Sequence, residues 1–416
     1  MSHLLNNKNL IGINSIGRIG KLFLWNQLIE KHFGGAVINI GRTAGQKLED
    51  IVQSLETDTT YGSLYHFLYG HACSGKRFEI VDYDEAIIAC DGFLIKFLMK
   101  ERNPLYINWK KENVGIVVDC TGQFTDPTIS ADNSKGSLRG HLEGGAEKII
   151  LSAPFKIKDK SLKMPDDSIM AVYGINHLNY NPAVHQIISA ASCTTTCLSH
   201  MMKPLLEHKE TSKILTASMS TIHAATNTQS VLDTTPKAGA SDLRKNRSVL
   251  NNVIISTTGA AKALEFVMPE IQSIGFMADS VRIPTNSVSL IILNLTFNSG
   301  LNAKGEAIIN KKLINSLYEQ ASEGPQKDLL YFTEKQNTSA DFLGFKAAAI
   351  IEGCETHTRT GFLPLKADML SQFGISHNKD INLPVTHAKI FGWYDNEFGS
   401  YVNCLSRLAI YIDKKC

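Results

Sequence analysis

The feature that most constrains the fold is a glycine-containing turn between an apolar strand and a helix near the start of the chain. Residues 10–14 are apolar enough for a buried strand, and the turn SIGRIG (15–20) follows at once. Residues 21–33 then carry apolar side chains on one helical face, and 36–40 form a second apolar strand. This order is a βαβ unit, which predicts a parallel sheet.

The rest of the first half continues this pattern. Further buried strands are expected at 114–120, 147–153 and 185–192. The polar, lysine-rich stretch 156–167 lies between two of them and is interpreted as a solvated surface insertion. We therefore predict an α/β fold whose first domain, residues 1–191, is a doubly wound, Rossmann-type dinucleotide-binding domain.

The pattern of expected strands and helices changes after Ser192. Long β-rich segments such as 280–297 alternate with helical stretches, which predicts an α+β catalytic domain with a mainly antiparallel sheet over 192–398. Residues 400–412 place apolar side chains on one helical face. A C-terminal helix within 399–416 is expected to pack back on the first domain.

Composition excludes several classes of protein. The 416 residues carry 42 basic and 40 acidic side chains, a net charge of +2 that does not favour a nucleic-acid partner. Apolar runs are too short to cross a membrane, which takes roughly 20 residues, and the first ten residues do not resemble a signal peptide. A cytoplasmic protein with no nucleic-acid and no membrane partner is expected.

The cysteines do not indicate a metal site. The eight cysteines form no CxxC pair, so neither a zinc ribbon nor a redox dithiol is supported, and no metal is expected. Their positions are 73, 90, 120, 193, 197, 354, 404 and 416.

The glycine turn suits a dinucleotide. Gly17, Arg18 and Ile19 open the helix, where backbone N–H groups can approach a pyrophosphate. The first glycine of the G-x-G-x-x-G pattern falls on Ser15. At the end of the second strand, where NAD-binding domains carry a carboxylate, the chain has Ile40 with Arg42 close by, which favours NADP. The alternative is that Arg42 simply points to solvent.

One cysteine and one histidine are candidates for chemistry. Cys193, in ASCTTTC (191–197), follows an expected strand and opens a helix, where the dipole favours a thiolate. His223 ends a β-like run in STIHAATNTQ (220–229) and could serve as the base that a cysteine nucleophile needs. Taken singly, either residue could be a buried structural side chain.

These motifs together resemble the phosphorylating glyceraldehyde-3-phosphate dehydrogenase family over nearly the whole chain. The matching segments are INSIGRIG (13–20), TGQFT (121–125), ILSAP (150–154), ASCTTTC, STIHAATNTQ, DLRKNR (242–247), STTGAAKAL (256–264), VRIPTNSVSL (281–290), SEGP (322–325) and WYDNEFG (393–399).

The resemblance implies a role for each site residue. Cys193 would attack D-glyceraldehyde 3-phosphate to give a thiohemiacetal and then a thioester, with His223 as base and hydride passing to NAD or NADP. Inorganic phosphate would release 1,3-bisphosphoglycerate. The phosphate-binding residues implied are Thr226, Thr228 and Arg282 at one anion site, and Ser192, Thr194, Thr258 and Gly259 at the other. Lys245 is implied as a further phosphate-facing residue. The cofactor-binding residues implied are Gly17, Arg18, Ile19, Arg42, Arg102, Thr121, Gly122, Ser152 and Asn396.

The family is typically a homotetramer, and this is carried over as an expectation. In one branch, NAD-specific members place a leucine and a proline of a neighbouring subunit against the adenosine ribose, where this chain has Thr234 and Thr235. This difference again favours NADP acceptance, alongside NAD.

The chain also departs from the family pattern. Thr196 replaces an asparagine, Lys245 replaces an arginine, and the tyrosine after the WYDNE motif is exchanged with its neighbour at Ser400 and Tyr401. Pro204 falls inside the helix that follows Cys193 and is expected to kink it, and the stretch 343–390 is longer than usual.

Two alternatives remain open. One is an erythrose-4-phosphate dehydrogenase, which would not form an acyl phosphate, and Thr194, Thr258 and Gly259 argue against it. The other is a catalytically silent homologue with a binding or regulatory role, and the retention of Cys193, His223 and Arg282 argues against that.

Overall fold

The structure, a computed structural model, describes residues 5, 8–70, 78–376 and 379–416. Cys73 and most of the N-terminal segment assessed for a signal peptide lie outside these residues. The chain divides into two compact units, which are described separately. The first comprises Met1–Thr196 and Glu397–Cys416, and the second comprises Cys197–Asn396. The domain limits expected from the sequence stay a prediction.

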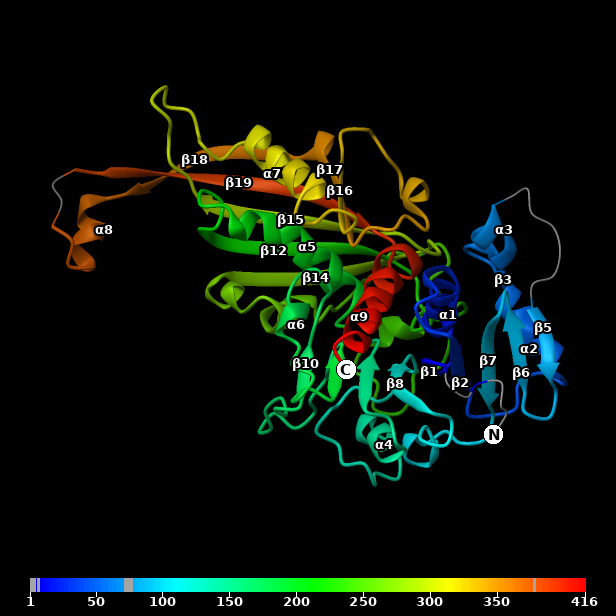
Figure 1. The fold of residues 1–416 in the computed structure, drawn as a ribbon. Coiled ribbons are helices and arrows are strands. Elements are labelled where there is room, and N and C mark those ends of the chain that lie inside the picture. The colour runs from blue at the N-terminus through cyan, green and yellow to red at the C-terminus, as the bar shows by residue number, and fades with distance from the viewer. Residues whose placement is uncertain (1–4, 6–7, 71–77, 377–378) are drawn as a thin grey trace. The chain divides into compact units, whose positions relative to one another are not determined.

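The first unit is built on one mixed sheet, with strand order β10-β11-β9-β8-β1-β2-β7-β6-β5 (Figure 1). Its strands are β1 (Leu10–Asn14), β2 (Gly35–Asn39), β5 (Phe78–Asp82), β6 (Ile87–Cys90), β7 (Phe93–Leu98), β8 (Val114–Asp119), β9 (Lys148–Leu151), β10 (Ser168–Met170) and β11 (Ile187–Ser189). β3 (Thr57–Asp58) and β4 (Gly62–Ser63) form a separate small hairpin.

The pairing within this sheet confirms the predicted fold class. Every pair from β10 to β7 is parallel, whereas β5, β6 and β7 form an antiparallel edge that the sequence did not indicate. Strand β11 is shorter than the predicted 185–192, because the chain turns at Ala191, whose φ is 55°. Residues 156–167 form a largely exposed loop, as expected for a surface insertion.

Helices cover this sheet. They are α1 (Arg18–Glu30), α2 (Leu48–Glu56), α3 (Leu64–Tyr69), α4 (Leu138–Glu143), the π-helical turn Phe398–Val402 and α9 (Asn403–Asp413). The helix predicted at 21–33 begins earlier, at Arg18, and ends at Glu30 because Lys31 adopts a left-handed φ of 51°. The segment predicted as a continuous helix from 400 instead begins with the π-helical turn. Gln27 of α1 donates to Ser406 of α9 in the buried interior.

The second unit is a mostly antiparallel sheet with order β13-β14-β12-β15-β19-β17-β16, and β18 pairs with β19. Its strands are β12 (Ile214–Ala224), β13 (Ile254–Ser256), β14 (Gly275–Ile283), β15 (Ser289–Asn298), β16 (Leu330–Thr333), β17 (Ala349–Glu352), β18 (His357–Leu365) and β19 (Ile381–Tyr394). Its helices are α6 (Ala260–Val267), α7 (Lys311–Glu323), α8 (Ala367–Gln372) and most of α5 (Cys193–Glu207).

Buried and partly exposed side chains alternate along the strands, which shows that one face of this sheet is covered. Along β15, Ile291, Leu293, Leu295 and Phe297 are fully buried, while the residues between them are partly exposed. Helix α5 approaches the sheet closely, because a side chain on Gly392 of β19 would overlap a methionine of that helix. This core holds β12 and β19; β12 carries His223, and its neighbour β14 carries Arg282.

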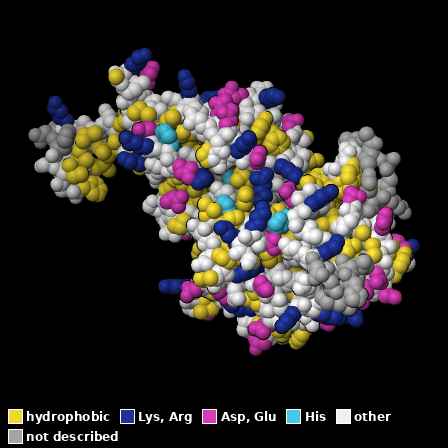
Figure 2. Space-filling model, viewed as in Figure 1, with side chains coloured by type: hydrophobic (Ala, Val, Ile, Leu, Met, Phe, Trp, Pro, Cys, Tyr) yellow, Lys and Arg dark blue, Asp and Glu magenta, His cyan; other side chains and the backbone are white. Residues whose placement is uncertain are grey.

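A long hairpin accounts for part of the extended 343–390 stretch. β18 and β19 pair from His357–Lys389 to Leu365–Ile381, and α8 lies at their far end (Figure 1). Hydrophobic side chains are visible over α8, while Lys, Arg, Asp and Glu are spread over the face shown in Figure 2. No helix among the described residues is long and apolar enough to cross a membrane.

Candidate active site

A pocket lies where the first unit's strand order changes direction. β1 is flanked by β2 and β8, and ligands bind at the carboxyl ends of such strands. The pocket there has a volume of about 280 Å³. It is lined by Asn14, Ser15, Asn39, Ile40, Gly41, Arg42, Arg102, Thr121, Gln123 and Phe124. It therefore brings together three predicted cofactor residues, Arg42, Arg102 and Thr121, with Ile40.

A buried polar network supports the wall of this pocket. The Asp119 carboxylate accepts from Asn14 at 2.7 Å and from the Thr121 hydroxyl at 2.6 Å. Trp109 Nε1 donates to His141 Nδ1 at 2.9 Å. Because an indole N–H can only donate, His141 carries its proton on Nε2, which faces Asp119 at 3.2 Å. Asn39 extends the network by donating to Asn14 at 2.9 Å.

The turn into α1 fits a phosphate-binding role. Ser15, standing where the pattern has glycine, adopts a φ of 82°, a conformation that side chains rarely take. A Cβ on Gly20 would lie 2.0 Å from the Ser15 carbonyl oxygen, so only glycine fits there. Gly17 is the N-cap residue of α1 and no side chain caps the helix, so its first N–H groups suit an anion.

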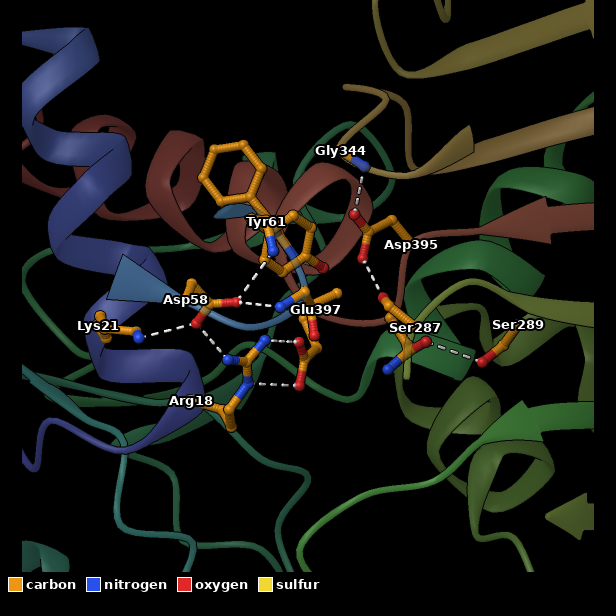
Figure 3. A network of polar contacts seen from close by, with 12 residues as sticks. Arg18, Lys21, Asp58, Tyr61, Ser287, Ser289, Gly344, Asp395 and Glu397 are labelled. Carbon is orange, nitrogen blue, oxygen red and sulfur yellow. Dashed lines mark hydrogen bonds and ion pairs between the residues drawn. The ribbon is translucent and has the colours of Figure 1, made fainter. Parts of the chain in front are cut away.

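The Arg18 side chain is engaged with carboxylates. Its guanidinium forms ion pairs with Asp58 and Glu397, and Lys21 binds Asp58 at 2.8 Å (Figure 3). Burial opposes ionisation of Asp58, but Lys21, the Tyr61 N–H and Arg18 together hold its pKa below the ordinary value. Arg18 is thus left with its backbone N–H as the group that can face a pyrophosphate.

The other predicted cofactor residues of this unit lie on the loops after its strands. Arg102 Nε donates to the Gly41 carbonyl at 3.2 Å. Gly122 has a φ of 64°, which glycine tolerates best, and follows Thr121 directly. Ser152, after β9, donates its N–H to the Asp119 carbonyl at 2.9 Å.

The candidate nucleophile sits at a tightly built helix start. Cys193 is the first residue of α5 and is partly exposed. Ser192 caps the helix by accepting from the Thr195 N–H at 3.1 Å, and the Cys193 sulfur lies 4.0 Å from the Thr194 hydroxyl. Tyr401 donates to the carbonyl of the left-handed Ala191 at 3.2 Å. Pro204 lies within α5, as its sequence position indicated.

In the second unit, His223 and Arg282 are register partners on β12 and β14. The guanidinium contacts the imidazole Nδ1 and donates to the Ala224 carbonyl at 3.1 Å. Burial, and then the charge of Arg282, lower the pKa of His223 to about 3. The imidazole is therefore neutral at physiological pH.

The predicted phosphate-binding residues of this unit fall into three groups. The Thr226 and Thr228 hydroxyls lie 2.9 Å apart after β12. Thr258 and Gly259 lie at the N-terminus of α6, where the Thr258 hydroxyl accepts the Ala260 N–H at 3.2 Å. Lys245 is an exposed residue of the short 3-10 helix Leu243–Asn246, and its carbonyl accepts from the Ser230 hydroxyl at 3.1 Å.

Asn396 lies two residues after the end of β19. It is 4% exposed, and its side-chain oxygen accepts from the Ser289 hydroxyl at 3.0 Å. Ser287 donates to the neighbouring Asp395 at 2.8 Å, and Asp395 also accepts the Gly344 N–H. The two serines thus bind the side chains of Asp395 and Asn396 in the WYDNE motif.

Comparison with known proteins agrees with this geometry. Residues 9–127 match the model of the NAD binding domain of glyceraldehyde 3-phosphate dehydrogenase, and 192–396 match that of its C-terminal domain. The chain is 33% identical over 404 residues to the glyceraldehyde-3-phosphate dehydrogenase of Streptomyces coelicolor, covering 97% of this chain and 98% of that protein. The chain belongs to the glyceraldehyde-3-phosphate dehydrogenase family.

Other relatives cover the chain as fully. Glyceraldehyde-3-phosphate dehydrogenase 1 of Bacillus subtilis is 32% identical over 405 residues, covering 97% of this chain and 98% of that protein. The cytosolic enzyme of Chlamydomonas reinhardtii is 31% identical over 415 residues, covering 99% and 98%. The predicted family is confirmed, and with it an oxidoreductase whose first domain belongs to an NAD-binding type.

Several polar residues at the site of this family member were missed from the sequence. Asn14, Asn39 and Asp119 each end a strand that abuts the cofactor pocket, and this shared position was a usable signal. His141 and Ser289 had no local signal, because their partners are distant in sequence.

Proposed function

We propose that this chain catalyses the reversible, phosphorylating oxidation of D-glyceraldehyde 3-phosphate to 1,3-bisphosphoglycerate, as a cytoplasmic homotetramer in glycolysis or gluconeogenesis. The observation that carries the proposal is Cys193 at the Ser192-capped start of α5, in a chain of this family. A helix N-terminus stabilises a thiolate, the form of cysteine that attacks an aldehyde.

In the proposed mechanism, the Cys193 sulfur adds to the aldehyde carbon, and the proton of its thiol ends on the aldehyde oxygen, which gives a thiohemiacetal with a hydroxyl group. His223, held neutral by burial and by Arg282, accepts the hydroxyl proton as hydride leaves. When bound, the nicotinamide cofactor accepts that hydride. Inorganic phosphate then attacks the carbonyl carbon of the resulting thioester. The carbon–sulfur bond breaks, which releases the acyl phosphate and leaves Cys193 as a thiolate.

Two anion sites serve this reaction in the proposal. Thr226, Thr228 and Arg282 bind the substrate's own phosphate, and Lys245 is a further phosphate-facing cation. Ser192, Thr194, Thr258 and Gly259 bind the attacking phosphate. The pairing of the Thr226 and Thr228 hydroxyls, and the position of Gly259 at the start of α6, support these roles.

The cofactor proposal extends to NADP. The pocket at the carboxyl ends of β1 and β2 contains Arg42 and Arg102, and Ile40 stands where a carboxylate would repel a 2′-phosphate. The glycine turn at α1, Thr121, Gly122 and Ser152 suit the remainder of a dinucleotide, and Asn396 would hold the nicotinamide carboxamide. Acceptance of NADP alongside NAD is expected.

The decisive experiment is an assay with glyceraldehyde 3-phosphate, with and without phosphate, using NAD and NADP in parallel. Cys193→Ser should abolish turnover because a hydroxyl is a far weaker nucleophile near neutral pH. Cys197→Ser, at a fully buried cysteine on the same helix, is the matched control and should retain activity. Substantial activity in Cys193→Ser, or turnover that ignores phosphate, would contradict the proposal.

A further inference from the structure

Ser289, which none of the site roles above includes, links two parts of the catalytic unit. It is the first residue of β15, is 1% exposed, and lies in register with Tyr394 of β19. Its hydroxyl accepts the Ala224 N–H at 3.0 Å and donates to the Asn396 side-chain oxygen at 3.0 Å. One side chain thus joins the residue after His223 to Asn396.

The directions of these two hydrogen bonds follow from the groups involved. The Ala224 N–H can only donate, so the Ser289 oxygen is the acceptor in that contact. The single hydroxyl proton is then directed to Asn396, whose Oδ1 accepts it. The amide of Asn396 is therefore held in one orientation, and its Nδ2 is the end that can donate to a ligand.

We infer that Ser289 is a positioning residue for the nicotinamide ring. By fixing the Asn396 amide, it directs Nδ2 at the carboxamide oxygen of the cofactor and holds the ring in one of its two flipped orientations. The inference rests on the proposed role of Asn396. The same hydroxyl also anchors Ala224, whose carbonyl accepts from Arg282, so the nicotinamide anchor and the His223–Arg282 pair share one support.

Ser287 provides a matched control within the same segment. Ser287 is buried like Ser289, and its hydroxyl also donates to a side chain of the WYDNE motif. Its partner is the carboxylate of Asp395 (Figure 3). Removing its hydroxyl therefore perturbs the same packing without touching Asn396.

The test compares binding of NAD with binding of ADP-ribose, which has no nicotinamide, by calorimetry on the full-length protein. Ser289→Ala should raise the dissociation constant for NAD roughly five- to tenfold, which corresponds to the loss of one hydrogen bond, and should change the dissociation constant for ADP-ribose by less than about twofold. Ser289→Cys, which keeps the volume but donates weakly, should behave similarly. Ser287→Ala should change both ligands equally or not at all.

The outcomes separate this inference from the function it rests on. If Asn396→Ala does not weaken NAD relative to ADP-ribose, the proposed role of Asn396 is wrong. If Asn396→Ala does so but neither Ser289 variant does, the inference alone is overturned. Equal weakening of both ligands by the Ser289 variants would show a general structural role and would also overturn it.

Discussion

At the scale of single residues, the most informative difference from the NAD-binding pattern is Ile40. It lines the cofactor pocket beside Arg42 and Arg102 without contributing charge. Ile40→Asp should reduce kcat/KM with NADP at least tenfold more than with NAD, because a carboxylate repels the 2′-phosphate. Ile40→Asn controls for size and polarity. Steady-state kinetics with both cofactors would measure this, and a thousandfold preference for NAD in the unmodified protein would refute NADP acceptance.

Arg282 has two separable effects. Arg282→Leu should raise the KM for glyceraldehyde 3-phosphate more than tenfold, with a smaller effect on a non-phosphorylated aldehyde, because a charge-assisted contact to phosphate is lost. It should also raise the pKa of His223 from about 3, since the arginine charge contributes to lowering it, although burial remains the larger cause.

An NMR titration of the His223 imidazole would measure the second effect, and Arg282→Lys, which keeps the charge, should restore much of the low pKa. Equal kinetic losses on both aldehydes, with an unchanged titration, would point to a structural role for Arg282 alone.

At the scale of elements, Arg18 joins three segments of the first unit. It belongs to α1, and its partners are Asp58 of β3 and Glu397, which precedes the C-terminal helical segment. Asp58 has a fully buried side chain, so Asp58→Asn leaves the Arg18 and Lys21 charges without that counter-ion. It should lower the free energy of unfolding by ~2–4 kcal/mol at pH 7.

This loss should depend on pH in a defined direction. The folded-state pKa of Asp58 is lowered, so its stabilisation is fully present above the unfolded-state pKa of about 3.9 and is lost as pH falls through the folded-state value. Urea unfolding at several pH values should show the two proteins converging in acid. Asp380→Asn, at the exposed Lys366–Asp380 pair, is the control and should lower the free energy of unfolding much less, because solvent screens an exposed ion pair. Equal effects of the two variants would contradict the argument.

At the scale of the whole molecule, an exposed apolar segment bears on how many copies of the chain associate. Large apolar side chains are exposed in the segment 231–255, and Leu232 is 70% exposed. Thr234 and Thr235, which the family resemblance sets near a neighbouring subunit's cofactor, follow in the same segment. We expect another copy of the chain to cover it, because exposed apolar clusters of this kind mark interfaces.

Light scattering should give a tetramer for the unmodified protein and a smaller species for Leu232→Asp, because a charge buried at an interface is costly. Leu178→Asp, at an equally exposed leucine of the first unit, should leave the mass unchanged. A monomeric unmodified protein, or a Leu232→Asp variant that stays tetrameric, would exclude this role for the segment.

Periodicity and motif spacing predicted what is local in the chain. The strands at 10–14 and 114–120, the helix after the glycine turn and the two-sheet α/β architecture follow from short stretches of sequence, because burial on one face imposes a repeat that is readable within a few residues. The family follows from the resemblance of the motifs. Element ends were less accurate: α1 begins at the polar Arg18, and the antiparallel edge β5–β7 had no distinctive pattern.

The amino-acid sequence by itself determined the residue types available for chemistry, the order of the elements and the glycine that α1 requires. Only the tertiary structure decided which polar groups meet. Arg18 with Glu397, Trp109 with His141, and Ser289 with Asn396 each join residues on separate elements. Such pairs leave no local signature, because a buried polar group needs a partner but does not specify where along the chain that partner lies.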